Sequence, residues 1–226
     1  MKKTFPMLIT MLLLVCLSAK AQDWYFEPID YDEIAKNIKV KESNLYYPKL
    51  FERFQQADTT MTTQERRHLL YGYTQQAAYS PYARSTYNDS ITLDFNKETF
   101  ERDEIVEFLR VTDSILKDVP FSFRTLSMQV FALEELGQME EAQKKTAQLN
   151  MCINTVLSTG NGINEKDAMY ITYVEQEYYL INIFGFDFGG SQQLIGDCDY
   201  LTLAENEEQL EGLYFNASAC LNSMTK

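Results

Sequence analysis

The chain has 226 residues, 33 of them acidic and 20 basic, so its formal net charge at pH 7 is −13. A balance this acidic repels nucleic-acid backbones and anionic lipid headgroups, so we expect no nucleic-acid partner and no role at a membrane surface. Hydrophobic residues make up 45% of the chain and aromatic residues 13%, which is typical of a folded protein and excludes a disordered one. The length suits one domain with a single core.

The first segment of the chain, residues 1–21, has the features of a secretory signal peptide. Lys2 and Lys3 form a basic head, residues 7–17 are apolar apart from one threonine, and residues 19–21 read Ala-Lys-Ala, a small-x-small cleavage signal. The apolar run is too short to span a bilayer as a helix, which takes about 20 residues. We therefore expect an exported protein, periplasmic or extracellular.

The mature chain is then expected to be a single helix-rich domain, residues 22–226, with no membrane insertion of its own. Anchoring through a lipid on Cys16 is the alternative. The residues before that cysteine, Leu-Leu-Val at 13–15, disfavour it, because a lipoprotein signal has a small residue immediately before the cysteine.

Most of the mature chain has the apolar periodicity of amphipathic helices. A capping box at residues 62–65 (Thr-Thr-Gln-Glu) predicts a helix start, and Pro48 suits the first turn of another helix. The helices predicted by these patterns cover residues 30–40, 48–57, 62–79, 99–118, 120–136, 139–157 and 165–184.

One pair of these helices resembles the middle of a tetratricopeptide repeat. The resemblance rests on residues 133–142 (Leu-x-x-Leu-Gly-Gln-Met-Glu-Glu-Ala), where Gly137 would make the turn and Ala142 would let the helices approach. We find no clean copy about 34 residues to either side, the period that an array requires. The predicted fold class is mainly α, with helical hairpins packed in a solenoid-like or bundle array.

The C-terminal part changes character between residues 191 and 219. Residues 198–204 and 212–219 have the composition of strands and flank an acidic turn at residues 205–208. We therefore predict a small antiparallel β-hairpin, which must pack on the helices because two strands alone are marginally stable.

The mature chain keeps three cysteines, Cys152, Cys198 and Cys220. Cys198 and Cys220 are nearly symmetric about the acidic turn, so we predict that they can face each other and form a disulfide. The other interpretation is that both are small buried residues.

A set of aromatic, glycine and polar motifs runs from about Pro28 to Phe215. In chain order these are Tyr46-Tyr47-Pro48-x-Leu50, Asp58, Thr62, Leu70-Tyr71-Gly72-Tyr73, Gln75, Tyr79, Pro81-Tyr82, Gly160-Asn161-Gly162, Glu177-Tyr178, Gln193-Leu194, Asp199-Tyr200 and Tyr214-Phe215. The set resembles domain of unknown function 4919, a family of exported proteins from Bacteroides-type bacteria. The resemblance implies export, a single domain and a helix-rich fold, and it supplies no activity.

Four residues are the candidate binding site: Tyr73, Gln76, Tyr79 and Tyr82. At helical spacing Tyr73 and Gln76 share a face, and the other two tyrosines close the helix beside them. Aromatic planes beside an amide can stack on, and hydrogen-bond to, a sugar or a peptide. The alternative is that these side chains fill the seam between two helices, as aromatic stripes mostly do.

No catalytic or metal-binding motif is present in the sequence, and we expect no cofactor. His68 is the only histidine and is expected at the surface or at its boundary with the core, and the cysteines lack the CxxC spacing of a zinc site. The acidic residues at 101–107 and 205–211 lie in runs that are typical of solvated surfaces.

The function that these observations favour is a non-catalytic, exported binding or interaction module with a protein, peptide or glycan partner. One alternative is a hydrolase of glycans or peptides whose paired carboxylates are brought together only by the fold. Another is a structural part of an envelope assembly, which would expose a large apolar patch.

Overall fold

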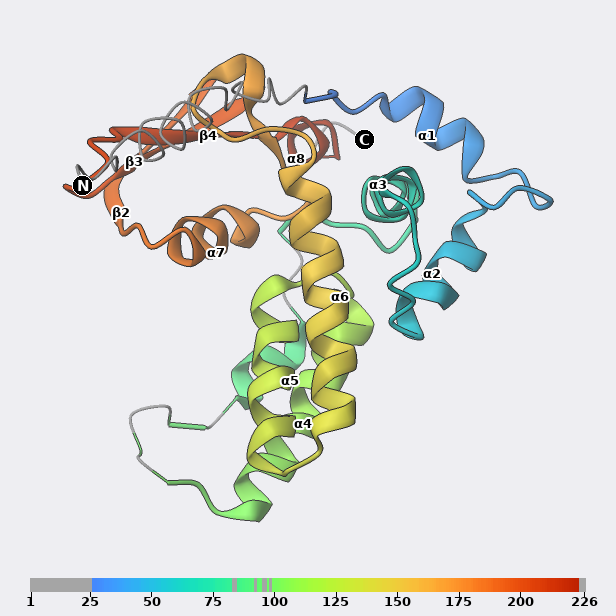
Figure 1. The fold of residues 1–226 in the computed structure, drawn as a ribbon, viewed down its shortest axis with the longest axis vertical. Coiled ribbons are helices and arrows are strands. Elements are labelled where there is room, and N and C mark those ends of the chain that lie inside the picture. Colours follow the sequence, from blue (N-terminus) through green and yellow to red (C-terminus); the bar gives the residue numbers. More distant parts are fainter. Residues whose placement is uncertain (1–25, 83–84, 92, 95–96, 98, 224–226) are drawn as a thin grey trace, which may run out of the picture.

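The computed structural model describes residues 26–82, 85–91, 93–94, 97 and 99–223. The predicted signal peptide lies outside these residues. The described part of the chain is mostly helical, with a four-stranded sheet near the C-terminus (Figure 1). Its helices are α1 Tyr31–Asn37, α2 Tyr47–Gln55, α3 Thr63–Gly72, α4 Arg102–Asp118, α5 Phe123–Glu135, α6 Met139–Leu157, α7 Glu175–Ile183 and α8 Ser218–Ser223. Its strands are β1 Met169–Tyr170, β2 Phe188–Ile195, β3 Cys198–Leu203 and β4 Gly212–Asn216. None of the helices in the described ranges is long and apolar enough to cross a bilayer.

The capping box predicted at the start of α3 is confirmed. The Thr62 hydroxyl accepts a hydrogen bond from the Glu65 backbone N–H, and the Glu65 carboxylate accepts one from the Thr62 N–H. The helix ends earlier than predicted, at Gly72, and continues as one 3₁₀ turn over Tyr73–Gln75. The Thr74 hydroxyl donates to the Tyr71 carbonyl oxygen (2.7 Å), a local bond that competes with helix continuation.

The helical hairpin predicted from the Leu-Gly-Gln-Met pattern is formed by α5 and α6. Gly137 has φ +71°, and its N–H donates to the Glu134 carbonyl while the Gln138 N–H donates to the Leu133 carbonyl. This pattern is a Schellman motif, in which a left-handed glycine satisfies the last carbonyls of a helix.

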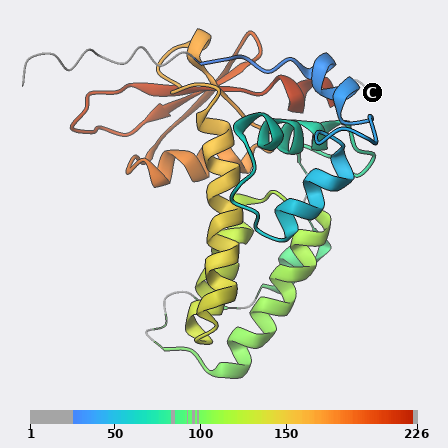
Figure 2. The same cartoon turned by 45° about the vertical axis from the view of Figure 1, so that its right-hand side comes forward.

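Helices α4, α5 and α6 form a three-helix arm that extends away from the sheet (Figures 1 and 2). The chain then enters the sheet instead of adding another helical pair, so the predicted solenoid-like array is not seen among the described elements. The coarser prediction, a mainly helical domain with C-terminal β structure, is confirmed.

The sheet has the strand order β1-β4-β3-β2. The predicted hairpin corresponds to β3 and β4, which pair antiparallel with Leu201 opposite Leu213. The prediction of two strands was incomplete, because β2 also pairs antiparallel with β3 and β1 pairs parallel with β4. Residues 218–223, which follow β4, are helical.

The predicted helix over residues 165–184 is wrong in its first half. The Asn164 side chain caps a short 3₁₀ turn, after which Met169 and Tyr170 join β4 as β1. Helix α7 begins only at Glu175, where the Gln176 side-chain oxygen accepts hydrogen bonds from the backbone N–H groups of Thr172 and Tyr173 (2.8 and 3.2 Å). The buried Gln176 side chain therefore satisfies donors that a longer helix would have bonded internally.

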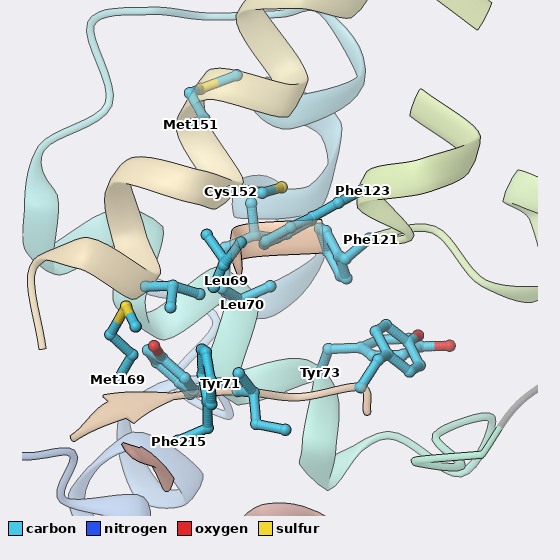
Figure 3. Packing of buried hydrophobic residues seen from close by; sticks show 14 of the residues in the cluster. Leu69, Leu70, Tyr71, Tyr73, Phe121, Phe123, Met151, Cys152, Met169 and Phe215 are labelled. Carbon is cyan, nitrogen blue, oxygen red and sulfur yellow. The ribbon is translucent and has the colours of Figure 1, made fainter. Parts of the chain in front are cut away.

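The core lies where α3, the upper part of α6 and the sheet meet (Figure 3). Tyr71 is fully buried in it and donates its hydroxyl to the Tyr170 carbonyl (2.9 Å), which joins α3 to β1. A smaller apolar cluster around Ile105, Phe108 and Ala132 joins α4 to α5 in the arm. The main core therefore reaches into α5 and α6, and the second cluster adds a separate contact between α4 and α5.

Candidate functional site

The four residues predicted to bind a ligand do not form one exposed surface. Tyr73 is only 5% exposed, and its ring contacts those of Tyr79 and Phe121, with centroids 5.8 and 5.3 Å apart. The Tyr79 hydroxyl donates to the Thr172 carbonyl (2.8 Å), whereas Tyr82 is 60% exposed. Two of the tyrosines therefore serve as packing between α3 and the segment before α7.

The remaining member of that set, Gln76, donates its side-chain amide to the carbonyl oxygen of Gly72 (3.1 Å). This bond satisfies a carbonyl at the end of α3. The Gln76 amide group is thus used locally, in capping a helix.

The disulfide predicted between Cys198 and Cys220 is not formed, and both thiols are free and buried. The sulfur of Cys198 lies 4.0 Å from the Glu165 carbonyl oxygen, while that of Cys220 lies 3.8 Å from the Tyr79 hydroxyl oxygen. Burial raises the pKa of the Cys198 thiol to about 11 and that of Cys220 to about 12. The symmetry expected in the sequence is lost because Cys220 belongs to α8 and not to the hairpin.

His68 is only 4% exposed, so the expectation of a surface or boundary position is wrong. One ring nitrogen lies 2.8 Å from the Gln64 carbonyl oxygen, and the other lies 3.2 Å from the Asn37 side-chain nitrogen. Within the described residues, no three His, Cys, Asp or Glu side chains gather as a metal site would require.

A pair of carboxyl groups, Glu177 on α7 and Asp199 on β3, lies between the helix and the sheet. Glu177 is fully buried, and neither of its carboxyl oxygens receives a hydrogen bond from a described residue. Burial, followed by the charge of Asp199, raises the pKa of Glu177 to about 9. At neutral pH the Glu177 carboxyl group is therefore protonated.

The sequence contains a usable indication of this pair. Asp199 alternates with Leu201 and Leu203, so it occupies a core-facing position of β3. Glu177 is three and four residues from the buried Leu180 and Ile181, so it lies on the buried face of α7. An acid in an apolar stripe distinguishes both residues from the solvated acidic runs.

A second feature is an apolar pocket of about 470 Å³ at the end of α6 beside the sheet. It is bounded by the end of α6, the loop that follows, the α7–β2 connection and the start of β4. Asn161 provides the one polar side chain in the lining, and its oxygen accepts from the Ile163 N–H (3.0 Å). The lining residues are Phe26, Leu157, Gly160, Asn161, Ile163, Phe184, Phe186, Leu210 and Leu213.

The loop that forms one wall of this pocket is fixed by glycine. Gly162 has φ +74°; its N–H donates to the Asp167 carbonyl, and its own carbonyl accepts from Tyr214 on β4, both at 2.8 Å. A Cβ atom at Gly160 would collide with the backbone carbonyl groups of Asp167 and Ala168. The Gly-Asn-Gly motif therefore shapes the pocket through its backbone.

An acidic recess of about 350 Å³ adjoins the apolar pocket, and Phe186 lines both. The α7–β2 connection forms one side of the recess, and the turn between β3 and β4 forms the other. In this turn the Asn206 side chain makes hydrogen bonds of 2.8–3.0 Å with the backbone of Ala204 and Leu210. Four exposed carboxylates surround the recess, and none makes a salt bridge with a described residue: Asp187, Glu205, Glu207 and Glu208.

Comparison with known proteins identifies one family. A family model described as "Domain of unknown function (DUF4919)" matches residues 32–226, from within α1 to the end of the chain. No curated protein and no solved structure matches the chain. Because the family match covers most of the sequence, including the carboxyl pair and every pocket-lining residue except Phe26, the chain belongs to the DUF4919 family.

Proposed function

We propose that this protein is an exported, non-catalytic binding module that holds an apolar side chain of a protein or peptide partner in the apolar pocket. The observation that carries the proposal is the pocket itself, about 470 Å³ of space lined almost entirely by apolar groups. Ligand sites are typically concave and apolar with few polar groups, and filling such a pocket removes apolar surface from water.

The chemistry of the lining supports binding over catalysis. No titratable side chain lines the pocket, so it offers no general acid, base or charged nucleophile. Ile163 on the rim is 48% exposed, which leaves apolar area available to a partner.

A hydrolase is the second candidate, and the Glu177–Asp199 pair is the observation that favours it. Glycosidases combine a carboxyl group of raised pKa with a second, ionised carboxylate. Glu177 is fully buried, however, so a substrate could reach it only if α7 moved away from the sheet. The open pocket supports binding without any such movement.

The test uses a neutral fluorescent probe, N-phenyl-1-naphthylamine, with two matched variants. Ile163→Asp puts a charge on the pocket rim, and Ile183→Asp puts the same charge on α7 at a residue outside the lining; the two isoleucines are 48% and 46% exposed. We expect saturable probe binding that Ile163→Asp weakens at least tenfold and that Ile183→Asp leaves within twofold.

Absence of saturable binding, or equal loss in both variants, would overturn the proposed function. The hydrolase is tested separately with nitrophenyl glycosides and peptide anilides. Saturable turnover that is lost in Glu177→Gln would replace binding with catalysis as the function.

A further inference from the structure

The apolar pocket and the acidic recess are two parts of one surface. Phe186 lines both hollows, so they lie next to each other. The β3–β4 turn borders both as well, because the hydrogen bonds of Asn206 hold Leu210, in the pocket wall, to Ala204, in the recess. A ligand that enters the pocket therefore passes close to the carboxylates of the recess.

We propose that the partner segment is an extended peptide with a large apolar residue followed or preceded, two positions away, by Lys or Arg. This inference rests on the proposed function and names the chemistry of its partner. The apolar side chain enters the pocket, and the cation lies among the carboxylates of Asp187, Glu205, Glu207 and Glu208.

Charge complementarity identifies the cation. The four carboxylates are exposed and form no salt bridge with any Lys or Arg in the described ranges, so their negative potential faces solvent. Like-charge repulsion would disfavour an acidic segment at the same place. The formal charge of −13 adds a long-range attraction for basic partners.

The spacing follows from the geometry of an extended chain. Side chains at positions i and i+2 of an extended peptide point to the same side, about 7 Å apart. The two hollows share Phe186 and lie side by side, so they suit two side chains on the same side of a peptide, whereas adjacent side chains point to opposite sides. A bound peptide of this kind would place one side chain in each hollow.

The experiment measures fluorescence anisotropy of labelled nine-residue peptides on the full purified protein. Three peptides have the same Gly-Ser background and carry Trp-x-Lys, Trp-x-Glu or Gly-x-Lys at the centre. We expect saturable binding of the Trp-x-Lys peptide, at least tenfold weaker binding of the other two, and weakening of the first by added salt.

Matched variants locate the effect. Glu207→Gln/Glu208→Gln neutralises two carboxylates of the recess, and Glu134→Gln/Glu135→Gln neutralises two exposed, adjacent glutamates of α5 in the arm. The recess variant should lose most of the preference for Lys over Glu and still bind N-phenyl-1-naphthylamine, and the arm variant should keep the preference.

Two outcomes would overturn the inference while the proposed function stands. The first is equal binding of the Trp-x-Lys and Trp-x-Glu peptides. The second is a recess variant that keeps the full preference for Lys over Glu. In both cases N-phenyl-1-naphthylamine would still bind, and Ile163→Asp would still weaken its binding. Failure of the neutral probe and of all peptides to bind would instead remove the proposed function itself.

Discussion

The buried carboxyl of Glu177 makes a quantitative prediction about stability and pH. Its pKa rises from the ordinary value of 4.5 to about 9 in the folded protein, chiefly through burial and then through Asp199. The folded state therefore binds this proton more tightly than the unfolded state. The free energy of unfolding should fall as pH rises, starting near pH 4.5 and levelling off above about pH 9.

The magnitude follows from the size of the shift. Each pKa unit corresponds to about 1.4 kcal/mol, so at pH 7 the group lowers the free energy of unfolding by up to about 3 kcal/mol. Glutamine has the same shape, is neutral at every pH and can donate to the Asp199 carboxylate. The Glu177→Gln variant should therefore match the wild type near pH 4 and exceed its stability at pH 7.

Urea unfolding at pH 5 and pH 8 tests this reasoning. The stability gap between Glu177→Gln and the wild type should widen by up to about 4 kcal/mol between these two pH values. Asp199→Asn should reduce the pH dependence only in part, because burial of Glu177 is the larger cause of the shift. Glu211 is exposed at the same end of the sheet, so Glu211→Gln is the control. The stability difference between this variant and the wild type should be the same at pH 5 and pH 8.

A gap that stays constant from pH 5 to pH 8 would refute the raised pKa of the buried Glu177 carboxyl group. A Glu177→Gln variant that is less stable than the wild type at pH 8 would refute it as well, since a neutral isostere would then be worse than the acid it replaces.

Two further predictions concern the loop and the thiols. Gly160→Ala should lower the free energy of unfolding by several kcal/mol, because its Cβ would collide with the Asp167 carbonyl, whereas Gly137→Ala has open space and should lose about 1 kcal/mol for its left-handed conformation. Urea midpoints compare the two, and equal losses would contradict the role of Gly160 in packing. Ellman's reagent should not react with Cys198 and Cys220 in the folded protein, because both thiols are buried with raised pKa values. Unfolding alone, with no reductant added, should make both thiols reactive. A titre that rises by two thiols when reductant is added would show a disulfide instead.

The parts of this fold that were predictable are those that neighbours along the chain decide. The start of α3 follows from Thr62 and Glu65, which bond each other's backbone within one turn. The α5–α6 turn follows from Gly137, which takes a left-handed conformation that most residues avoid. Interactions of this kind span three to five residues, so the local pattern contains the information they need.

The sequence indicates the two members of the carboxyl pair but not their pairing. Both acids stand in positions where the periodicity calls for an apolar residue, and that contrast is visible along a single element. What the periodicity does not contain is which helix face meets which strand, so the pairing of Glu177 with Asp199 required the packing of α7 on the sheet.

The sequence by itself determined most of the helical segments and the presence of the β3–β4 hairpin, because caps, turns and periodicity are local, and its motifs indicated the family. Only the tertiary structure decided that Met169 and Tyr170 form a strand, since their partners on β4 lie 46 residues further along. It also decided the apolar pocket, whose walls come from segments that meet only once Gly160 and Gly162 let the loop approach β4. Such contacts depend on the burial of side chains far apart in sequence, which no local pattern encodes.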